Sequence, residues 1–474
     1  MEKIIVTILL LSMLALIAVP MTRSAATLPN LKFSVTPVQE QFEDGYTGEP
    51  LPVVPGYYLP YDVDLVNGEY FANGGEGVYV AVIDTGLVNG WWNFLPPTAN
   101  IRTDLGRGWS YDIKWNKRIN DFVWTPDPAR GFITNLDGSG HGTHVTSTIV
   151  GYQRSTVGIT PHIVLGVAPK ATIIPLLGLD YWLVDCPDPN YPGEEGGKVL
   201  FGGGDDWMLC SAIDYVAGLA EANPSWKIMC TNSWGSSEPS PAIRASIDNA
   251  ITKGVIFVFS AGNDGTAGMG WPGAYSEVIS VAAGGWTMQN LGYPPSNPPA
   301  PYRWYLSDVP EKLNTENNPV EQLFGVPNNY YDNNWQIYLG TFSGRPNAAL
   351  GQSWKDLDVV APGCYVVGPF QPEVAWTGTA WVRSATAYYG LWGTSMAAPH
   401  VAGVAAIVAQ HYPSFNQFDM EWVLNKAASR IPLSSDTKWL YDQFYGVEFP
   451  NSDHDAGSGW LTADNAMKTA SVYP

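Results

Sequence analysis

Three short segments that lie far apart in the sequence carry side chains able to do chemistry together. Asp84 directly follows the apolar run 78–83, which places a carboxylate at the end of a strand, where open α/β sheets hold their sites. His141 stands among small residues in Asp-Gly-Ser-Gly-His-Gly-Thr-His-Val, so its imidazole would be accessible where a helix begins. Ser395 opens an Ala/Val-rich helix, where the helix dipole and free N–H groups favour developing negative charge. An acid, an imidazole and a hydroxyl are the groups that nucleophilic catalysis by serine requires.

Each segment taken alone has a more ordinary interpretation. Asp84 could simply cap the turn after a strand, and Ser395 could be a helix N-cap. Asp-Thr-Gly at residue 84 also opens the site of pepsin-like proteases, but that chemistry needs two carboxylates and the sequence has no second Asp-Thr-Gly or Asp-Ser-Gly. His141 and His144 might together suggest a metal site, yet no third ligand stands at a suitable spacing. We therefore expect no metal in the chemistry.

In the order Asp, His, Ser, the segments Asp-Thr-Gly, His-Gly-Thr-His-Val and Gly-Thr-Ser-Met-Ala-Ala-Pro-His resemble the active-site signatures of the subtilisin family, or subtilases. The resemblance runs from about Gly77 to the C-terminus, interrupted by insertions. It implies a serine endopeptidase in which Ser395 attacks the peptide carbonyl, His141 transfers the proton and Asp84 holds the imidazole. The segment Phe-Ser-Ala-Gly-Asn resembles the oxyanion segment of the family and implies Asn263 as a side-chain donor to the oxyanion.

The resemblance also implies two segments between which an extended peptide binds as an added strand. Glycines would let backbone meet backbone closely, although a flexible glycine loop is the alternative, and no Lys follows them in the spacing of a nucleotide-binding loop. Main-chain recognition would give broad action on unfolded or extended proteins. Asp205 and Asp206 could add a preference for basic residues. The substrate-binding residues predicted in this way are Gly202, Gly203, Gly204, Ser233, Trp234, Gly235, Ala261 and Gly262.

The elements that must position these residues repeat in the order strand, helix, strand. The apolar runs lack polar alternation and are rich in Val and Ile, which is typical of strands covered on both faces. The pattern predicts a three-layer α/β fold, a doubly wound and mostly parallel sheet with helices on both faces. The resemblance to the subtilases implies that this fold is subtilisin-like, with loop insertions. The predicted strands are residues 78–83, 171–177, 227–231, 255–260 and 278–283, and the predicted helices are residues 141–150, 207–222, 241–253, 395–410 and 418–428.

Composition narrows the class of partner. The formal net charge is −20, but charged residues make up only 14% of the chain, so the charge reflects a scarcity of Lys and Arg. Nucleic-acid binding needs clustered cations, so we exclude it. Low charge with 20 Trp and 25 Tyr fits an exported protein in a harsh, acidic medium.

The N-terminus predicts export. Lys3 precedes the apolar run 4–19, and Ser-Ala-Ala ending at Ala26 offers a cleavage site, so residues 1–26 are predicted to be a signal peptide and the protein secreted, extracellular or associated with the cell surface. An uncleaved membrane anchor and a buried core helix are the alternatives. No later segment reaches about 18 consecutive apolar residues.

The remaining chain divides into two predicted parts. Residues 27–76 are predicted to be a short N-terminal extension or a reduced prosegment, with autocleavage before Tyr79. Residues 77–474 are predicted to be the catalytic domain, with surface insertions near 180–198, 286–345 and 371–389.

The four cysteines, in an exported chain, could form two disulfides with three possible connectivities. A bridge between Cys186 and Cys210 would staple a local loop, and the remaining two are Cys230 and Cys364. We expect no cofactor for the chemistry and a monomer. Structural calcium is expected only by analogy with the family.

Three other classes of protein were weighed. Sedolisins use a serine in Gly-Thr-Ser but pair it with Glu and Asp and use an Asp for the oxyanion, so His141 and Asn263 argue against them. An α/β-hydrolase esterase would need its acid and histidine after Ser395, where only His400, His411 and His454 lie without the expected context. A non-enzymatic protein on this scaffold would normally lose a member of the triad, and none is lost.

Overall fold

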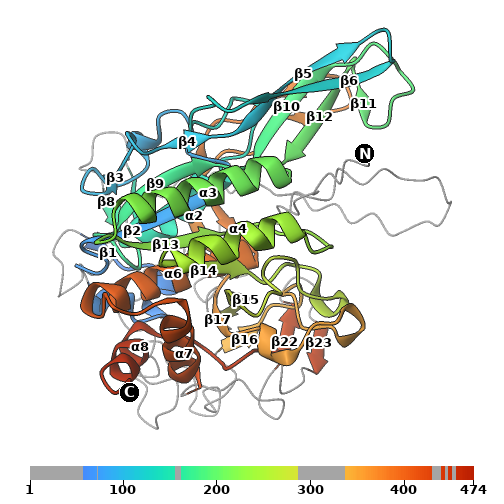
Figure 1. Cartoon of the computed structure of the whole chain (residues 1–474). Helices are drawn as coiled ribbons and strands as arrows, with labels where there is room; N and C mark the ends of the chain where they lie inside the picture. The colour runs from blue at the N-terminus through green and yellow to red at the C-terminus, as the bar shows by residue number, and fades with distance from the viewer. Residues whose placement is uncertain are drawn as a thin grey trace.

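A mostly parallel sheet forms the centre of the protein in the computed structural model, which describes residues 57–71, 73–154, 162–286, 337–429, 439–442, 447–450 and 455–473 (Figure 1). Within these residues the sheet has eleven strands. The neighbours from β3 to β15 run parallel, whereas β15 and β16 pair antiparallel, as do β22 and β23. The strands in spatial order are β23 (Val447–Pro450), β22 (Trp439–Asp442), β16 (Ile337–Leu339), β15 (Ile279–Trp286), β14 (Val255–Ser260), β13 (Lys227–Asn232), β2 (Val78–Asp84), β9 (Thr172–Leu177) and β3 (Asn100–Ile101), with β17 (Val359–Pro362) on β15 and β4 (Arg107–Gly108) on β9.

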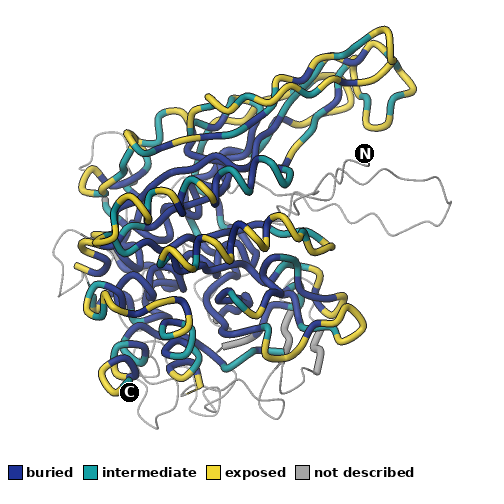
Figure 2. The backbone as a smooth tube through the Cα atoms, viewed as in Figure 1, coloured by how far each residue is buried: buried dark blue, intermediate teal, exposed yellow. Residues whose placement is uncertain are grey.

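Helices cover both faces of this sheet because successive residues of each strand point to opposite sides. On β2, Val80 and Val82 belong to one apolar core, and Ala81 and Ile83 belong to the other. Figure 2 shows the buried strands between the partly exposed helices. The first core contains α2 (His141–Val150), α6 (Thr394–His411), α7 (Gln417–Ala428) and α8 (Ala463–Ala470), and the second contains α3 (Asp206–Ala222) and α4 (Pro241–Thr252).

Local sequence sets where the helices begin. Asp205 caps α3 by accepting the N–H of Met208 at 3.0 Å, and Ser240 caps α4 just before a proline at its first position. Asn416 opens α7 with a reciprocal capping box. Such caps satisfy N–H groups that have no partner inside the helix. The predicted strands and helices agree with the structure to within three residues at each end, and the predicted α/β fold is confirmed.

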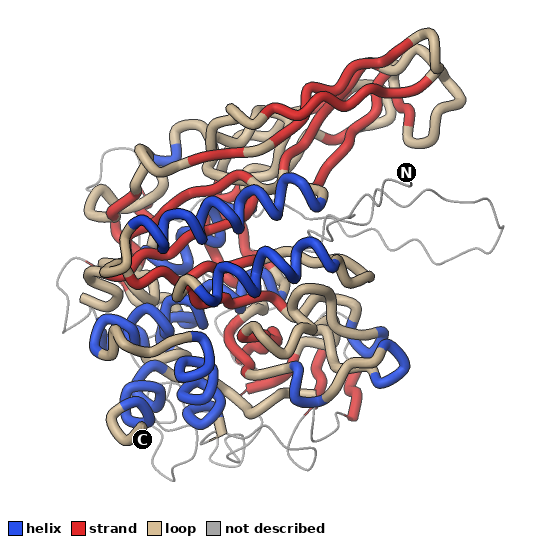
Figure 3. The backbone as a smooth tube through the Cα atoms, viewed as in Figure 1, coloured by secondary structure: helices blue, strands red, loops and turns tan. Residues whose placement is uncertain are grey.

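Two antiparallel ribbons project from one end of the sheet and form what we call the aromatic arm, residues 110–127 and 180–203 (Figures 1 and 3). Its aromatic rings pack edge to face, for example Phe122 against Phe201 and Trp124 against Trp182. The sequence analysis treated 180–198 as a surface insertion, whereas the structure makes it an ordered sheet with its own small core. The strands are β5 (Ser110–Asn116), β6 (Asp121–Asp127), β10 (Asp180–Asp185), β11 (Glu194–Glu195) and β12 (Lys198–Gly203).

The predicted insertion near 371–389 leans against this arm. The indole N–H of Trp381 donates to the carbonyl of Glu195 at 2.8 Å, and Arg383 pairs with Asp137 at 2.6 Å, close to the start of α2. The two insertions therefore support each other. The strands here are β18 (Val366–Phe370), β19 (Ala375–Trp376), β20 (Trp381–Val382) and β21 (Ala387–Leu391). Most of the insertion near 286–345 lies outside the described residues.

The segment 57–71, predicted to belong to an extension or prosegment, packs into the main core. Strand β1 (Tyr57–Tyr58) pairs with β8 (His162–Val164), which in turn pairs with β7 (Tyr152–Arg154). Helix α1 (Tyr61–Asp64) is buried, and the hydroxyl of Tyr61 donates to the carbonyl of Cys364. Val63 and Val66 join the core that contains α6. The predicted signal peptide and the rest of residues 1–56 lie outside the described residues.

The prediction of two disulfides is wrong, because Cys186, Cys210 and Cys230 all carry free thiols. Cys186 lies beyond the far end of β10, where Asp185 pairs with Lys198, whereas Cys210 follows the other end of β12 in α3. Five residues of extended strand separate these ends by roughly 17 Å, too far for a bridge. In the described part of the chain no helix is long and apolar enough to span a bilayer.

Candidate active site

Asp84 is the last residue of β2, and its carboxylate is completely buried at the C-terminal end of the parallel strands. The oxygens lie 2.8 and 3.0 Å from Nδ1 of His141, and one of them also accepts the N–H of Thr85 at 2.7 Å. The chain can turn sharply here because Gly86 adopts φ 76°, and a Cβ at that position would lie 2.1 Å from a neighbouring carbonyl oxygen. The acid is therefore fixed by the strand, the turn and the imidazole together.

His141 begins α2 and is also fully buried. The helix start is tied to the end of β2, since the hydroxyl of Thr85 accepts the N–H of Gly142 at 2.9 Å. With Nδ1 directed at the acid, Nε2 points to the other side of the ring, where it is buried and makes no hydrogen bond within the described residues. A carboxylate at Nδ1 fixes the tautomer that leaves Nε2 able to accept a proton.

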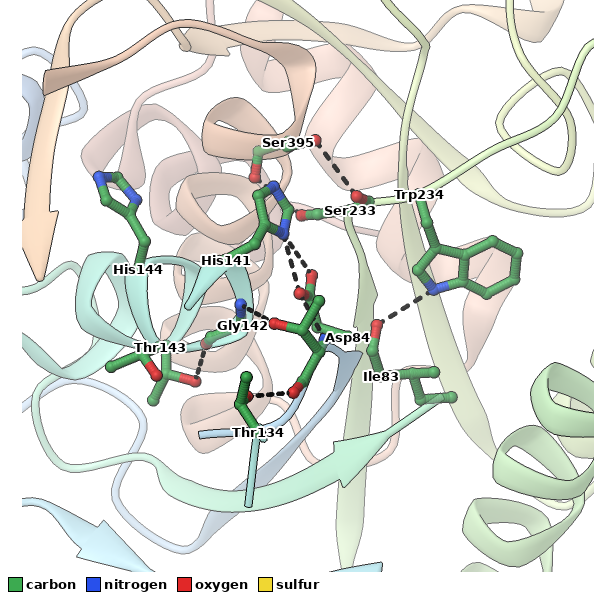
Figure 4. Close-up of polar contacts among 12 residues, drawn as sticks. Ile83, Asp84, Thr134, His141, Gly142, Thr143, His144, Ser233, Trp234 and Ser395 are labelled. Carbon is green, nitrogen blue, oxygen red and sulfur yellow. Dashed lines mark hydrogen bonds and ion pairs between the residues drawn. The ribbon is translucent and has the colours of Figure 1, made fainter. Parts of the chain in front are cut away.

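Ser395 lies on that other side. It is the second residue of α6, and Figure 4 shows the imidazole of His141 between the side chains of Asp84 and Ser395. The hydroxyl of Ser395 donates to the carbonyl of Ser233 at 3.2 Å, and the carbonyl of Ser395 accepts the hydroxyl of Ser233 at 2.7 Å. Rotation about the Cα–Cβ bond of the serine would redirect the hydroxyl toward Nε2. Such hydrogen bonds often tighten only when substrate binds.

Asn263 lies just beyond β14, next to the start of α6. Its Oδ1 accepts both the N–H and the hydroxyl of Thr394, each at 2.9 Å. These two bonds assign Oδ1 and leave the donor nitrogen on the other branch of the amide. An amide held in this way beside Ser395 can donate to a developing oxyanion.

The predicted substrate-binding segments lie at the ends of neighbouring elements. Gly202 and Gly203 pair with Tyr181 and Asp180 along one edge of β12, and Gly204 follows directly. A Cβ on Gly202 would lie 2.7 Å from the ring of Tyr181, so glycine lets the tyrosine pack against this strand.

The second segment follows β13. The indole N–H of Trp234 donates to the carbonyl of Ile83 at 3.1 Å, and its ring is buried, so only its backbone can meet a substrate. Gly235 lies next to it. Ala261 is buried and Gly262 is tied to the hydroxyl of Thr394 at 3.1 Å, so these two hold Asn263 in place.

Sequence reasoning missed the residues that reach the site from the arm. The carboxylate of Asp180 is buried and accepts hydrogen bonds from the hydroxyl of Ser110 at 2.7 Å and the amide of Asn135 at 2.9 Å, with Arg130 at 3.3 Å. It thus joins the root of the arm to the loop before His141. A signal was present, because Asp180 comes three residues after a buried parallel strand, at the edge where sites form.

Glu373, in the insertion near 371–389, was also not predicted from the sequence. This residue is half-buried, and burial raises the pKa of its carboxyl while the charge of His141 lowers it in part. The pKa of Tyr181 is held well above its ordinary range, mainly by burial and secondly by the charge of Glu373. Nothing in the sequence around Glu373 marks it as part of a site.

His144 plays a structural part. Its Nε2 lies 3.1 Å from the carbonyl of Val366, and burial, with the charge of His141, lowers its pKa to about 3. It is therefore neutral. No group of three or more His, Cys, Asp or Glu in the described ranges could hold a metal ion.

Two acidic side chains face each other away from the site. Asp358 is buried and accepts hydrogen bonds from the N–H of Ser280 at 2.7 Å and the amide of Asn425 at 2.6 Å. Burial, and then the charge of Asp358, raises the pKa of Glu421. Because Asp358 receives a donor on each oxygen, we assign the negative charge to it and the proton to Glu421.

The chain is similar to known proteins over most of its length. The model of the Subtilase family matches residues 75–459. Subtilisin DY of Bacillus licheniformis is 25% identical over 394 residues, covering 82% of this chain and 94% of its own. Subtilisin BL of Lederbergia lenta is 26% identical over 357 residues, covering 75% and 85%. Among solved structures, S41 psychrophilic protease is 21% identical with a TM-score of 0.49, covering 86% of this chain and 99% of its own.

The chain belongs to the subtilase family. It is a serine-type endopeptidase of the subtilisin kind, whose members use a Ser-His-Asp triad and need no cofactor for catalysis.

Proposed function

We propose that the protein is a secreted endopeptidase in which Asp84, His141 and Ser395 form the catalytic triad. The observation that carries the proposal is the buried pair between Asp84 and His141, with the hydroxyl of Ser395 on the opposite side of the ring.

The reaction follows from that order of side chains. Ser395 Oγ attacks the peptide carbonyl carbon, and its proton passes to Nε2 of His141 while Asp84 stabilises the imidazolium. The C–N bond then breaks, the proton goes to the leaving amine, and an acyl-enzyme remains on Ser395. Water, losing a proton to the same Nε2, hydrolyses this ester and restores the hydroxyl. Asn263 and the backbone N–H of Ser395 would receive the oxyanion at each stage.

Substrate would bind in extended form between Gly202–Gly204 and Ser233–Gly235. The pairing of β12 supports this proposal. At Gly202 and Gly203 this strand pairs with β10 along one edge, and its other edge there is unpaired within the described part of the chain. Main-chain hydrogen bonds along such an edge accept many sequences. The substrates are therefore unfolded or extended proteins.

Several predictions from the sequence remain part of this proposal: a signal peptide at 1–26, a monomer, no nucleic-acid partner, structural calcium and a catalytic domain at 77–474. The packing of 57–71 suggests one change. Processing would fall before residue 57 rather than anywhere before Tyr79, because removing α1 would strip buried side chains from the core.

Labelling with a serine-directed fluorophosphonate, followed by peptide mapping, tests the assignment together with casein hydrolysis. We expect the label on Ser395 and loss of nearly all activity in Ser395→Ala. Ser471→Ala, at an exposed serine near the C-terminus, is the matched control and should behave as the parent. Label on another residue, or normal casein hydrolysis by Ser395→Ala, would overturn the proposal.

A further inference from the structure

Glu373 is held beside the turn that leads into His141. The backbone of Gln371 accepts the N–H of Gly140 at 2.7 Å, and its side-chain amide donates to the carbonyl of Gly138 at 2.8 Å. On the other side of Glu373, the N–H of Val374 donates to the carbonyl of Asp137 at 3.0 Å. The chain is thus fastened to the Asp137–Gly140 turn two residues before the acid and one residue after it, so the backbone of Glu373 is held beside the turn that leads into His141.

Most of the other acids near these segments already have partners, whereas Oδ1 of Asp206 is buried and makes no hydrogen bond within the described residues. Asp137 pairs with Arg383. Asp180 is surrounded by Arg130 and neutral donors. Asp205, which the sequence analysis offered as a source of basic preference, is used instead as the cap of α3 and as acceptor for the hydroxyl of a tyrosine. These existing contacts, and the burial of the Asp206 oxygen, make these carboxylates weaker candidates than Glu373 for binding a substrate cation.

Glu373 differs from them. Within the described residues it forms no ion pair with Lys or Arg, and the cation that acts on it is His141, which is charged only when it holds a proton. A half-buried carboxylate without a permanent counter-charge is costly. A positively charged group from outside the chain would remove that cost.

We propose that Glu373 is a specificity-determining residue that binds a Lys or Arg side chain of the substrate next to His141. This inference rests on the proposed function, because it places the peptide along β12. The ring of Tyr181 links the two regions, since it packs on Gly202 and lies in the field of Glu373. A side chain from a peptide bound at Gly202, on the amino-terminal side of the scissile bond, would therefore reach the acid.

The electrostatics predict how the preference changes with pH. The groups that face Glu373 are His141 from α2 and Tyr181 from β10, with the pair Asp137 and Arg383 on the adjoining turn and hairpin. Burial raises the pKa of the Glu373 carboxyl, so it is neutral in acid and becomes charged as the pH rises. Preference for basic peptides should accordingly grow with pH.

Matched peptides test this inference: Lys against norleucine, and Arg against citrulline, at each of the first three positions before the scissile bond. We expect the parent to prefer the cation at one position, and Glu373→Gln to lower the Lys-to-norleucine ratio of kcat/KM about 5- to 20-fold, as for one partly screened ion pair. Activity on the norleucine peptide should stay within about twofold. Glu221→Gln, an exposed acid on α3, is the matched control and should leave the ratio unchanged.

Three outcomes would overturn the inference: a parent that ignores charge at all three positions, an unchanged ratio in Glu373→Gln, or an equal loss on both peptides, which would indicate a structural role. Glu373→Lys provides a second check, because it should shift preference toward a Glu-containing peptide. If the parent cleaves none of the peptides and no casein, the proposed function fails instead, so the two failures are distinguishable.

Discussion

The hydrogen bonds of His400 define a buried pair whose removal should be measurable. Nδ1 lies 2.8 Å from the carbonyl oxygen of Met396, and Nε2 lies 3.0 Å from a carboxylate oxygen of Asp62. A carbonyl and a carboxylate both accept hydrogen bonds, so each ring nitrogen of His400 lies against an acceptor. Both residues are buried. Asp62→Ala would leave Nε2 of His400 buried without its partner.

The expected loss is about 3–5 kcal/mol, the range found when one partner of a buried pair is removed. At roughly 2 °C per kcal/mol for a large domain, the melting temperature should fall by about 6–10 °C. Calorimetry in a Ser395→Ala background avoids self-digestion. Asp62→Asn should lose less, because its amide oxygen can still accept the hydrogen bond.

Glu76→Ala, at an exposed acid in the same part of the chain, is the control and should melt with the parent. The reasoning fails if Asp62→Ala melts within about 1 °C of the parent. That result would mean that the pair contributes nothing net and that 57–71 is held by apolar packing alone.

The other predictions concern turnover, acid response and substrate binding. Asn263→Ala should cut kcat roughly 10²–10³-fold, the loss known for such a donor in subtilisin, with an unchanged melting temperature; normal turnover would contradict its role. Glu421→Gln should stabilise the protein above about pH 4.5, by roughly 1–2 kcal/mol at pH 8. The raised pKa of Glu421 in the folded protein favours folding in acid, and this contribution to the free energy of unfolding is lost as the pH rises. Parallel pH–stability curves for parent and variant would argue against a shared proton with Asp358. Gly202→Ala should raise KM more than it lowers kcat, because the added methyl meets the ring of Tyr181; unchanged kinetics would show that this edge does not bind substrate.

The main sheet and its helices were predictable because strands buried on both faces appear in the sequence as continuous apolar runs. The strands β2 and β14 are rich in Val, Ile and Phe, and β13 is buried from its second residue onward. Each of the three ends at a residue of the site or just before one. The family and the enzyme class followed from the motifs around these ends. The same motifs pointed to Asn263, which the structure places beside Thr394 and Ser395.

The aromatic arm was not predictable in the same way. Its strands show no common pattern, since β5 alternates polar and apolar residues whereas β10 contains an apolar run. Its core is made of side chains contributed by two ribbons that are far apart in the chain. A Pro- and Gly-rich composition then suggested a loop. Glu373 was missed for a related reason, since only the pairing of its neighbours with the Asp137–Gly140 turn places it near His141.

The packing of residues 57–71 into the core was not predictable from the sequence, because a four-residue helix shows no periodicity. The hydrophobic residues of this segment reach core positions through contacts with the opposite end of the chain, which local sequence cannot reveal. The disulfide prediction failed because it relied on the count of cysteines and on the compartment, neither of which contains distances.

Contacts between the two ends of the described chain determine when, during folding, the helix that carries Ser395 is enclosed. The indole N–H of Trp460 donates to the carbonyl of Leu65 at 2.9 Å, and the N–H of Ala463 donates to the carbonyl of Val66 at 2.8 Å. These bonds close a loop of nearly 400 residues around the helix that carries Ser395, and closures of such length come late in folding. A chain that still lacks residues 455–473 cannot complete this enclosure, so we expect the helix that carries Ser395 to be enclosed only after that segment has been made.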